Sequence, residues 1–567
     1  MIKKYDVVVL GGGLAGLTLA IQLKQENSKL KILVLEKRID SAPLAIHKVG
    51  ESSSELGSFY LRDVLNLKNY LNEKQLPKFG FRFFLSEQHS DDIAKRVEVG
   101  SRILSPYPTH QIDRGILEND LSDMLLQIGV DFLLGTKVVD VKIEKENHWV
   151  TYENIALNEE VECRWVVDTT GRSSFLKKKL KLGKELAHNI NSSWFRLACE
   201  IDPDDWSENK DWLNRVDPGR RRLATNHLMG KGYWIWIIPL ISGSTSIGIV
   251  ADPEFHPFDQ INTFEKALSW MEKYEPLAAK IFKKQQEKAL DFKVMKNFAY
   301  DSKQFYSVDR WAVTGEAGAF MDPFYSPGSD FIGLGNSWVS DLINRDFKGE
   351  DIQLRTMIFE LTHKELLKGW ISLYQNMYSV FGNTQIMLMK IVWDWASYWA
   401  IPCVLFMNKG YVNVNVMKQY SANQNSIGQR FALLNEKMQK LFRDWDQFET
   451  ELLSNHYSNV FDLKILHQFQ SELPLRYEEN ELVQKINSNL SILEQLAAEI
   501  FRKVSTEIHA TPFDMPVNPY SADLNNDKVE WIEKSKDEKS ITFNESINED
   551  LNVMWILPQN IKCTTDV

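Results

Sequence analysis

The sequence predicts an α/β fold of the Rossmann-like, dinucleotide-binding type, with an inserted β-sheet domain and a C-terminal helical region. Three observations support this fold class. A glycine-rich turn at residues 11–16 lies between an apolar run and a helical pattern. Apolar alternation typical of strands recurs between residues 130 and 250. Beyond about residue 350 the strand patterns stop, and helical periodicity rich in Trp, Tyr, Phe and Met takes over.

The order of the predicted elements begins with a βαβ unit, in which the apolar residues 5–10 form a buried parallel strand. A helix from Leu14 to Gln25 and a second strand from Lys31 to Glu36 complete the unit. Later predictions are strands within 130–167, a hairpin over 233–250 that turns at Ser242-Gly243-Ser244, a helix over 262–286, a strand over 311–314 and a helix over 334–346.

Length and composition exclude several classes of protein. A chain of 567 residues is expected to form two or three domains. The net charge of −11 argues against nucleic acid as a partner, since phosphates require a basic surface. The four cysteines form no CxxC pair, so we expect no metal site and a reducing, cytoplasmic location. The apolar segment 386–407 contains Lys390 and Asp394, so no transmembrane segment is expected.

The glycine-rich turn carries the pattern of a dinucleotide site. Gly11 permits the tight turn, Gly13 lets a pyrophosphate approach the backbone, and Gly16 lets the helix pack on the strand. Glu36 ends the second strand, where a carboxylate would accept from ribose hydroxyls. The predicted binding residues of this unit are Gly11, Gly13, Leu14, Ala15, Gly16 and Glu36.

Two distant segments indicate that the dinucleotide is FAD. Residues 166–174 (VVDTTGRSS) and 313–318 (VTGEAG, with Glu316 in place of the usual Asp) resemble the second and third motifs of the p-hydroxybenzoate hydroxylase-type FAD monooxygenase superfamily. The resemblance covers residues 5 to about 345 and implies the GR2-type FAD-binding fold. Arg114 matches the family arginine near the flavin, with a surface salt bridge as its alternative role. The cofactor-binding residues that this resemblance adds are Arg114, Asp168, Gly171, Gly315 and Glu316.

The resemblance also sets the expected domain boundaries. The FAD-binding monooxygenase-like core covers residues 1–350, with a discontinuous FAD domain at about 1–50, 100–190 and 290–350. Parts of a substrate domain are expected at about 51–99 and 191–289. A C-terminal helical region follows over 351–510, and a polar tail occupies 511–567.

Four shorter segments resemble flavin-dependent halogenases. The string Trp234-Ile235-Trp236-Ile237-Ile238-Pro239 is similar to their WxWxIP signature. Residues 47–52 (HKVGES), 78–80 (KFG) and 322–328 (DPFYSPG) are similar to their conserved flavin-site segments. The family reaction uses reduced flavin and O₂ to form a C4a-hydroperoxide, which oxidises halide for transfer to an electron-rich aromatic.

This resemblance implies roles for three side chains. A lysine holds or activates the hypohalous acid beside the substrate, and Lys78 is the lysine in the matching context. Strand alternation alone could place it toward the site or toward solvent. Trp234 and Trp236 lie two apart on a strand and share one face. They either pack in the core or form a wall that keeps the substrate from the flavin.

The segment 322–328 also raises a difficulty for halide binding. Halogenases bind halide partly through backbone N–H groups in this loop, but Pro327 has none to offer. Gly328, and Ser326 or Ser329, remain as candidate halide donors. Pro323 and Gly328 are also predicted to contact the cofactor, and Ser326 is a predicted catalytic residue. The glutamate of tryptophan-specific halogenases has no counterpart at the matching position, which favours a phenol or pyrrole substrate. Asp330 is a candidate base or substrate-orienting residue, or else a helix N-cap.

Three hypotheses follow from these patterns. The first is a halogenase acting on an aromatic substrate, free or bound to a carrier protein. The second is a halide-independent FAD monooxygenase or oxidase of the same fold, and the third is a non-catalytic flavin-binding scaffold. Because no second GxGxxG occurs, a separate flavin reductase is expected to supply FADH₂. The aromatic-rich segment from Trp370 to Tyr411 is predicted to be a substrate lid, a carrier-docking surface or an internal helical core.

Overall fold

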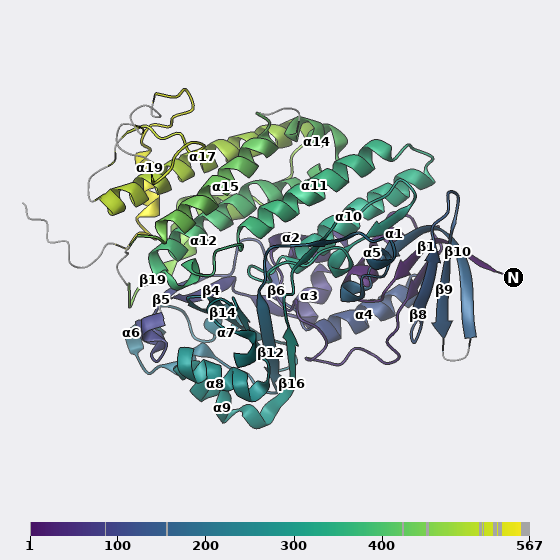
Figure 1. The fold of residues 1–567 in the computed structure, drawn as a ribbon, viewed down its shortest axis with the longest axis horizontal. Helices are drawn as coiled ribbons and strands as arrows, with labels where there is room; N and C mark the ends of the chain where they lie inside the picture. The colour runs from purple at the N-terminus through teal and green to yellow at the C-terminus, as the bar shows by residue number, and fades with distance from the viewer. Residues whose placement is uncertain are drawn as a thin grey trace, which may run out of the picture.

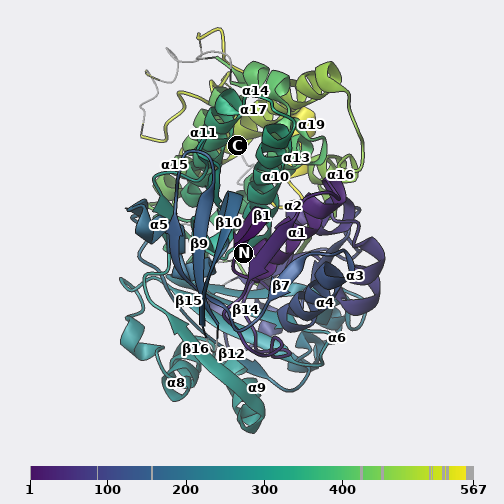
Figure 2. The same ribbon diagram turned by 90° about the vertical axis from the view of Figure 1, so that its right-hand side faces the viewer.

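In its described residues the computed structural model contains two large β-sheets, two small two-stranded sheets, and a layer of helices along one side of the large sheets (Figure 1). It describes residues 2–556 except for 86, 155–156, 422–424, 449–452, 510–512, 514, 526–529 and 531–535. The predicted α/β fold with a C-terminal helical region is confirmed. Figure 2, turned by 90°, shows the second sheet below the first and the helical layer above both.

The first sheet is built around the predicted βαβ unit. Strand β1 pairs in parallel with β2 on one side and with β10 on the other, and β10 also pairs with β18. The strands follow the order β7-β2-β1-β10-β9-β8. Their bounds are β1 Lys3–Leu10, β2 Ile32–Leu35, β7 Asp131–Leu133, β8 Lys137–Lys142, β9 His148–Asn154, β10 Leu157–Asp168 and β18 Trp311–Val313.

Helices that pack on this sheet position the nucleotide end of the molecule. Helix α1 (Leu14–Glu26) packs between the sheet and two other helices, α4 (Arg114–Gln127) and α10 (Gly328–Phe347). Helix α10 begins at Gly328, six residues before the predicted start. Short helices α2 (Glu55–Phe59) and α3 (Lys68–Lys74) belong to this side as well, because α2 packs on α10. The expected boundary at residue 51 therefore lies too early.

The second sheet has eight strands in the order β16-β12-β15-β14-β13-β4-β5-β19. The predicted hairpin is present as β14 and β15. The bounds are β4 Phe81–Leu85, β5 Val97–Gly100, β12 Asn191–Leu197, β13 Thr225–Gly230, β14 Tyr233–Pro239, β15 Thr245–Ala251, β16 Ala289–Met295 and β19 Tyr457–Asn459. Strand β16 extends this sheet past the expected boundary at residue 289. Strand β19 shows that the region after 350 is not wholly helical.

One face of the second sheet packs on helices α8 (Phe264–Tyr274) and α9 (Pro276–Lys284), with which it shares a separate hydrophobic core. The sequence predicted a single helix over 262–286. The structure breaks it at Glu275 because Pro276 cannot donate the backbone hydrogen bond that would continue α8. The remaining short elements are β3 Leu76–Lys78, β6 Thr109–Gln111, β11 Gly183–Glu185, β17 Tyr300–Ser302, α5 Phe175–Lys179, α6 Lys210–Leu213 and α7 Arg220–Leu223.

The C-terminal helices share the largest hydrophobic core with the FAD-binding side. Their bounds are α11 Gln353–Ser372, α12 Thr384–Tyr398, α13 Val404–Met407, α14 Val414–Tyr420, α15 Ile427–Trp445, α16 Lys464–Ser471, α17 Glu479–His509 and α19 Glu545–Leu551. Among the described residues, no helix combines the length and apolar character that crossing a membrane requires. In the tail, Leu524, Leu551 and Met554 are buried against the helices, so its described parts wrap the surface.

Candidate active site

The glycine-rich turn packs too tightly to accept larger residues. A Cβ on Gly16 would lie 2.0 Å from the carbonyl oxygen of Gly11. Gly11 adopts a φ of +106°, a region that favours glycine. Helix α1 then begins at Leu14, with Gly13 as N-cap and no side-chain cap. The first N–H groups of the helix, including those of Leu14 and Ala15, are thus available to a phosphate.

Glu36 lies beside this turn, immediately after the end of β2. Its carboxylate accepts hydrogen bonds from the N–H groups of Gly12 and Arg38, each at 2.8 Å. These two bonds fix the carboxylate at the carboxyl end of the strands. That is the place where the ribose of a bound dinucleotide lies in this type of fold.

Arg114 is the first residue of α4 and is almost fully buried. Its guanidinium donates to the carbonyl oxygen of Val49 at 2.8 Å and pairs with Glu118, whose carboxylate also contacts Nε2 of His47. Burial alone would raise the pKa of Glu118, but the cations Arg114 and Lys48, together with His47, hold it well below its usual range. The salt bridge proposed as an alternative role for Arg114 exists, but it is buried rather than exposed.

The second and third motifs meet because β10 and β18 pair in parallel, with Asp168 opposite Val313. Gly171 and Gly315 have φ values of +59° and +61°, so each turn requires glycine-like backbone. Asp168 is fully buried, and its carboxylate accepts from the N–H groups of Thr170 (2.9 Å) and Leu176 (2.6 Å). In the structure this carboxylate holds the turn from inside rather than facing outward.

Glu316 follows Gly315 in a short 3₁₀ turn, and its side chain is partly exposed. The Tyr300 hydroxyl donates to the backbone carbonyl oxygen of Glu316 at 2.7 Å, and not to its side-chain carboxylate. A carboxylate here stands where the family places the residue for the ribityl chain. The Nε atom of Arg114 is buried without a hydrogen-bond partner in the described part of the chain. This orphaned donor and the uncapped helix α1 fit a bound anionic cofactor.

The loop 322–328 precedes α10 and has an unusual backbone. Tyr325 and Ser326 both have positive φ, at +66° and +58°, a conformation that is costly for non-glycine residues and clusters at functional sites. The Ser326 N–H donates to the carbonyl oxygen of Pro323 at 2.8 Å, which closes the turn. Pro327 is the N-cap of α10, so Gly328 supplies the first N–H of an end without a side-chain cap.

Asp322 is the first residue of this loop, and its side chain is fully buried. Its carboxylate accepts from the Tyr378 hydroxyl at 2.5 Å and contacts Nε2 of His188 at 2.9 Å. The Tyr378 hydroxyl in turn accepts from the indole N–H of Trp234 at 3.1 Å. A hydrogen-bonded chain therefore connects the loop to the first tryptophan of the WxWxIP string.

Trp234 and Trp236 lie on the same face of β14, as their spacing predicts, with ring centroids 5.8 Å apart. Trp234 packs on Phe324 of the loop, with centroids 5.2 Å apart, and Trp236 lies flat on Gly248. Both rings are buried. The structure places both tryptophans in the core, and Trp234 also supports the loop through Phe324.

Lys78 points inward and is 1% exposed. Its ammonium donates to the carbonyl oxygen of Ser53 at 2.8 Å and lies 3.5 Å from the centre of the Phe81 ring. Burial lowers the pKa of Lys78 to about 7, although the carboxylates of Glu55 and Asp330 act in the opposite direction. Lys78 therefore changes its charge near neutral pH.

Asp330 lies in the first turn of α10 but does not cap it, because Pro327 is the N-cap. The N-cap alternative is therefore wrong. The carboxylate accepts from the Gly57 N–H and from the Tyr398 hydroxyl, each at 2.9 Å, and from the Ser54 hydroxyl. Burial raises the pKa of Asp330 to about 7. Lys78 and Asp330 are thus two buried titratable groups near each other, each with a pKa of about 7.

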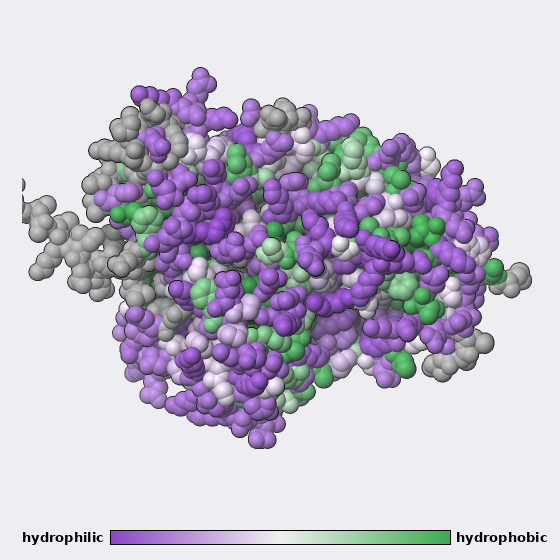
Figure 3. Space-filling model, in the orientation of Figure 1, coloured by the Kyte–Doolittle hydropathy of each residue, from purple (hydrophilic) through white to green (hydrophobic). Residues whose placement is uncertain are grey.

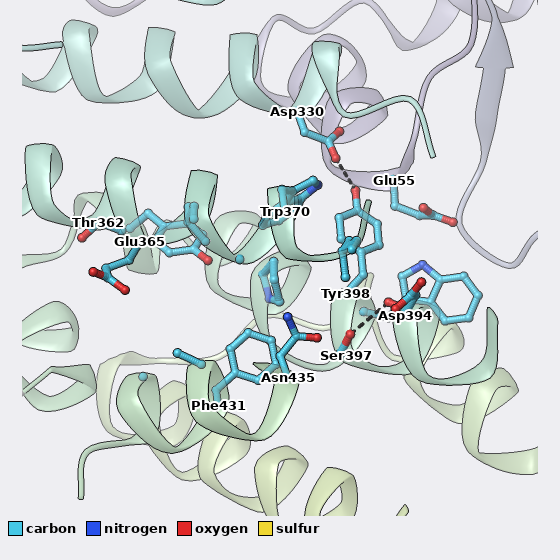
Figure 4. Close-up of a pocket in the computed structure, with 18 of the residues that line it drawn as sticks. Glu55, Asp330, Thr362, Glu365, Trp370, Asp394, Ser397, Tyr398, Phe431 and Asn435 are labelled. Atoms are coloured by element: carbon cyan, nitrogen blue, oxygen red, sulfur yellow. Dashed lines mark hydrogen bonds between the residues drawn. The ribbon is translucent and has the colours of Figure 1, made fainter. Parts of the chain in front are cut away.

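A cavity of about 750 Å³ extends from Asp330 into the C-terminal helices. Figure 4 shows Glu55, Asp330 and Tyr398 close together at one side of it, with the helices that carry Trp370 and Phe431 further along. Nine of its lining residues come from the segment between Trp370 and Tyr411: Trp370, Leu373, Asp394, Trp395, Ser397, Tyr398, Trp399, Pro402 and Tyr411. The segment is part of the buried helical core and also forms a wall of this cavity.

Several residues of the site were not predicted. Glu55 follows the HKVGES segment by three positions, so a carboxylate next to a recognised motif was the available signal. Tyr378, Tyr398 and His188 carry no local pattern. Tyr378 and Tyr398 reach the site because the C-terminal region packs on the sheets, and His188 reaches it from the segment that precedes β12.

Together the fold and the site define an FAD-dependent enzyme, in which the loop 322–328 borders a large cavity through Tyr325. The family model described as "FAD binding domain" matches residues 4–222. Flavin-dependent halogenase chlA of Dictyostelium discoideum is 27% identical over 443 residues, or 72% of either chain. The 1H-pyrrole-2-carbonyl-[peptidyl-carrier protein] brominase of Pseudoalteromonas luteoviolacea (strain 2ta16) is 27% identical over 62% of this chain and 79% of its own.

Among solved structures, the halogenase PltM shares the fold with a TM-score of 0.60 and 17% identity, covering 86% of this chain and 96% of its own. The chain is therefore similar to the flavin-dependent halogenases, as the WxWxIP string implied, and is an FAD-dependent enzyme. The third hypothesis, a non-catalytic scaffold, is therefore set aside.

Proposed function

We propose that the protein halogenates an electron-rich aromatic held in the cavity, and that Lys78 delivers the halogen. One observation carries the proposal: Lys78 is fully buried against Phe81 and close to Asp330, two residues that line the cavity. The ring of Phe81 lies between the Lys78 ammonium and Tyr325 of the flavin loop. A structural lysine would rarely be buried this completely without a carboxylate in contact with it.

Bound reduced FAD, with O₂, would supply the oxidising equivalent that converts halide to hypohalous acid. The side chains of this chain then have two tasks. The Lys78 ammonium donates a hydrogen bond to the oxygen of the hypohalous acid, which makes the halogen more electrophilic. The aromatic carbon forms a bond to halogen as the halogen–oxygen bond breaks, and the oxygen leaves as water with the proton from Lys78.

Asp330 completes the proton balance. The ring proton that the substitution expels passes to the Asp330 carboxylate, from which it returns to Lys78 or to solvent. A carboxyl with a pKa of about 7 is suited to this role, since it accepts and releases a proton near neutral pH. Ser54, Gly57 and Tyr398 hold the carboxylate in place by their hydrogen bonds.

The tryptophan pair would keep the substrate away from the flavin. Trp234 supports Phe324 in the loop, and Tyr378 fixes the indole through its hydroxyl. With a rigid aromatic layer at this position, the oxidised halogen would reach the substrate only past Lys78. Direct oxygen transfer to the substrate would thereby be suppressed.

Halide would bind at the start of α10, where the N–H of Gly328 has no side-chain competitor. Ser326 could add its hydroxyl. Pro327 supplies no N–H, and this favours the second candidate function, a halide-independent FAD monooxygenase or oxidase.

We further propose a separate flavin reductase and a cytoplasmic location, which fits the free thiols Cys163, Cys199 and Cys403.

The deciding experiment supplies FADH₂, O₂ and chloride or bromide with a phenolic acceptor and identifies products by mass. Halogenated product that is lost in Lys78→Ala, with FAD binding retained, supports the proposal. Oxygenated product that is indifferent to halide and to Lys78→Ala would establish the monooxygenase instead. A matched control is Lys74→Ala, an exposed lysine at the end of α3, which should behave as the parent.

A further inference from the structure

The cavity has two chemically different ends. At the inner end Glu55, Asp330 and Tyr398 bring oxygen atoms together beside Lys78. Figure 4 shows these residues grouped on one side and Thr362 with Glu365 on the far side. Thr362 and Glu365 lie on α11, and the Glu365 side chain is exposed. The cavity therefore runs from a buried polar end to an opening beside α11.

The wall between the ends is mainly apolar. It is formed by aromatic and aliphatic side chains from α11 to α15, among them Ile358, Leu366, Trp370, Trp395, Pro402 and Phe431. Asp394 also reaches this wall, but its carboxylate already accepts from Lys390 and Gln439, each at 2.8 Å, and from Tyr325. It is therefore not free to bind a polar substrate group.

The opening is bordered by a stripe of apolar side chains that are exposed to solvent. Leu354, Met357 and Leu361 lie on one face of α11, at spacings of three and four, and all three line the cavity. Their exposed fractions are 43%, 53% and 57%. In Figure 3, hydrophobic surface lies over the region of α11 and α14 within a largely hydrophilic face. Such a contiguous stripe at a cavity mouth indicates an apolar ligand group.

The size of the cavity also fits a ligand with a large apolar group. A volume of about 750 Å³ falls within the range of roughly 300–1,000 Å³ that encloses drug-sized ligands. A substrate of one aromatic ring would occupy the inner end alone and leave the apolar wall in contact with water.

We propose that the substrate is a free phenol bearing a long alkyl or acyl chain. The inference rests on the proposed function and names its substrate class. The phenol hydroxyl lies at the Glu55, Asp330 and Tyr398 end, where the Glu55 carboxylate, which receives a hydrogen bond from Gln470, accepts a second one from the phenol. The chain fills the apolar wall and ends near Leu354, Met357 and Leu361. A carrier-tethered ring would instead place a polar, amide-containing arm along this wall, which offers it few partners.

Binding measured without turnover tests the proposal separately from halogenation. The FAD-loaded protein, oxidised and without halide, is titrated calorimetrically with phenol and with 4-methyl-, 4-butyl-, 4-hexyl- and 4-octylphenol. Each buried methylene contributes about 0.8 kcal/mol, or about fourfold in affinity. We expect Kd to fall at about that rate along the series, with an increasingly negative heat-capacity change. A Kd that does not depend on chain length would overturn the proposal.

Gly369 offers a variant that blocks only the apolar part. It lines the cavity from within α11, and a Cβ there would meet no atom within 4 Å. Gly369→Leu should weaken 4-octylphenol at least tenfold and leave phenol unchanged, while Gly369→Ala, the matched control, should change neither much. Both substitutions favour the helix, so loss of folding is not expected.

Two further outcomes are decisive. Equal weakening of phenol and 4-octylphenol in Gly369→Leu would refute the placement of the chain. Turnover of a ring only when it is attached to a carrier protein would refute a free substrate. Chain-dependent binding without any halogenated product would leave the substrate class standing and reject the proposed function.

Discussion

Replacing Lys78 with methionine should stabilise the protein while it abolishes halogenation. The buried ammonium is costly, as its pKa of about 7 against an ordinary value of 10.5 indicates. That difference corresponds to roughly 5 kcal/mol of unfavourable free energy in the charged form. Methionine removes the charge but loses the bond to Ser53 and the contact with Phe81, which together offset about 1–3 kcal/mol. We therefore expect a net gain of about 2–4 kcal/mol at pH 6.

The gain should depend on pH with a definite sign. In the folded protein Lys78 releases its proton near pH 7, whereas in the unfolded chain it does so near 10.5. The cost of the charge is thus fully present below about pH 7 and disappears as the pH rises toward 10.5. The advantage of Lys78→Met over the parent should shrink over the same interval and reverse in sign once only the lost contacts remain.

Guanidinium chloride unfolding of parent and variant, followed at pH 6 and at pH 9.5, measures this difference. Lys74→Met is the matched control, because this exposed lysine at the end of α3 should show no pH-dependent difference. A Lys78→Met variant that is less stable than the parent at pH 6, or a difference that is the same at both pH values, would refute the reasoning. Either result would mean that Lys78 is not a buried cation.

Three other predictions concern the cofactor, the proton and the halide. Gly16→Ala should lower FAD affinity by at least 100-fold in a fluorescence titration, because its Cβ would lie 2.0 Å from the Gly11 carbonyl oxygen; unchanged affinity would contradict the assigned turn. Halogenation should follow a bell-shaped pH profile near neutrality, rising as Asp330 loses its proton and falling as Lys78 does, and Asp330→Asn should remove the rising limb; a retained limb would exclude Asp330 as the base. Pro327→Ser restores a backbone N–H and should lower the KM for halide severalfold; an unchanged KM would show that this N–H does not contribute.

Local patterns were sufficient for the parts of the protein whose chemistry depends on neighbours in the chain. The turn at residues 11–16, the strands on either side of it and the hairpin containing Trp234 and Trp236 were all predicted from spacing. These elements are governed by glycine backbone freedom and by the periods of strand and helix, which the sequence displays directly. The expected domain boundaries differ from the observed sheets, because a strand can hydrogen-bond into a sheet whose other strands are distant in sequence. Strands β16 and β19 do so.

The sequence by itself determined the FAD-binding fold and the halogenase resemblance, and it singled out Lys78 and Asp330. Only the tertiary structure decided which way Lys78 faces and which groups surround it. The packing of α10 on α2 brings Asp330 to Ser54 and Gly57, and α12 adds Tyr398. Burial and charge at these contacts come from segments hundreds of residues apart. A one-dimensional pattern cannot contain them, and they determine the pKa values and the cavity on which the reaction depends.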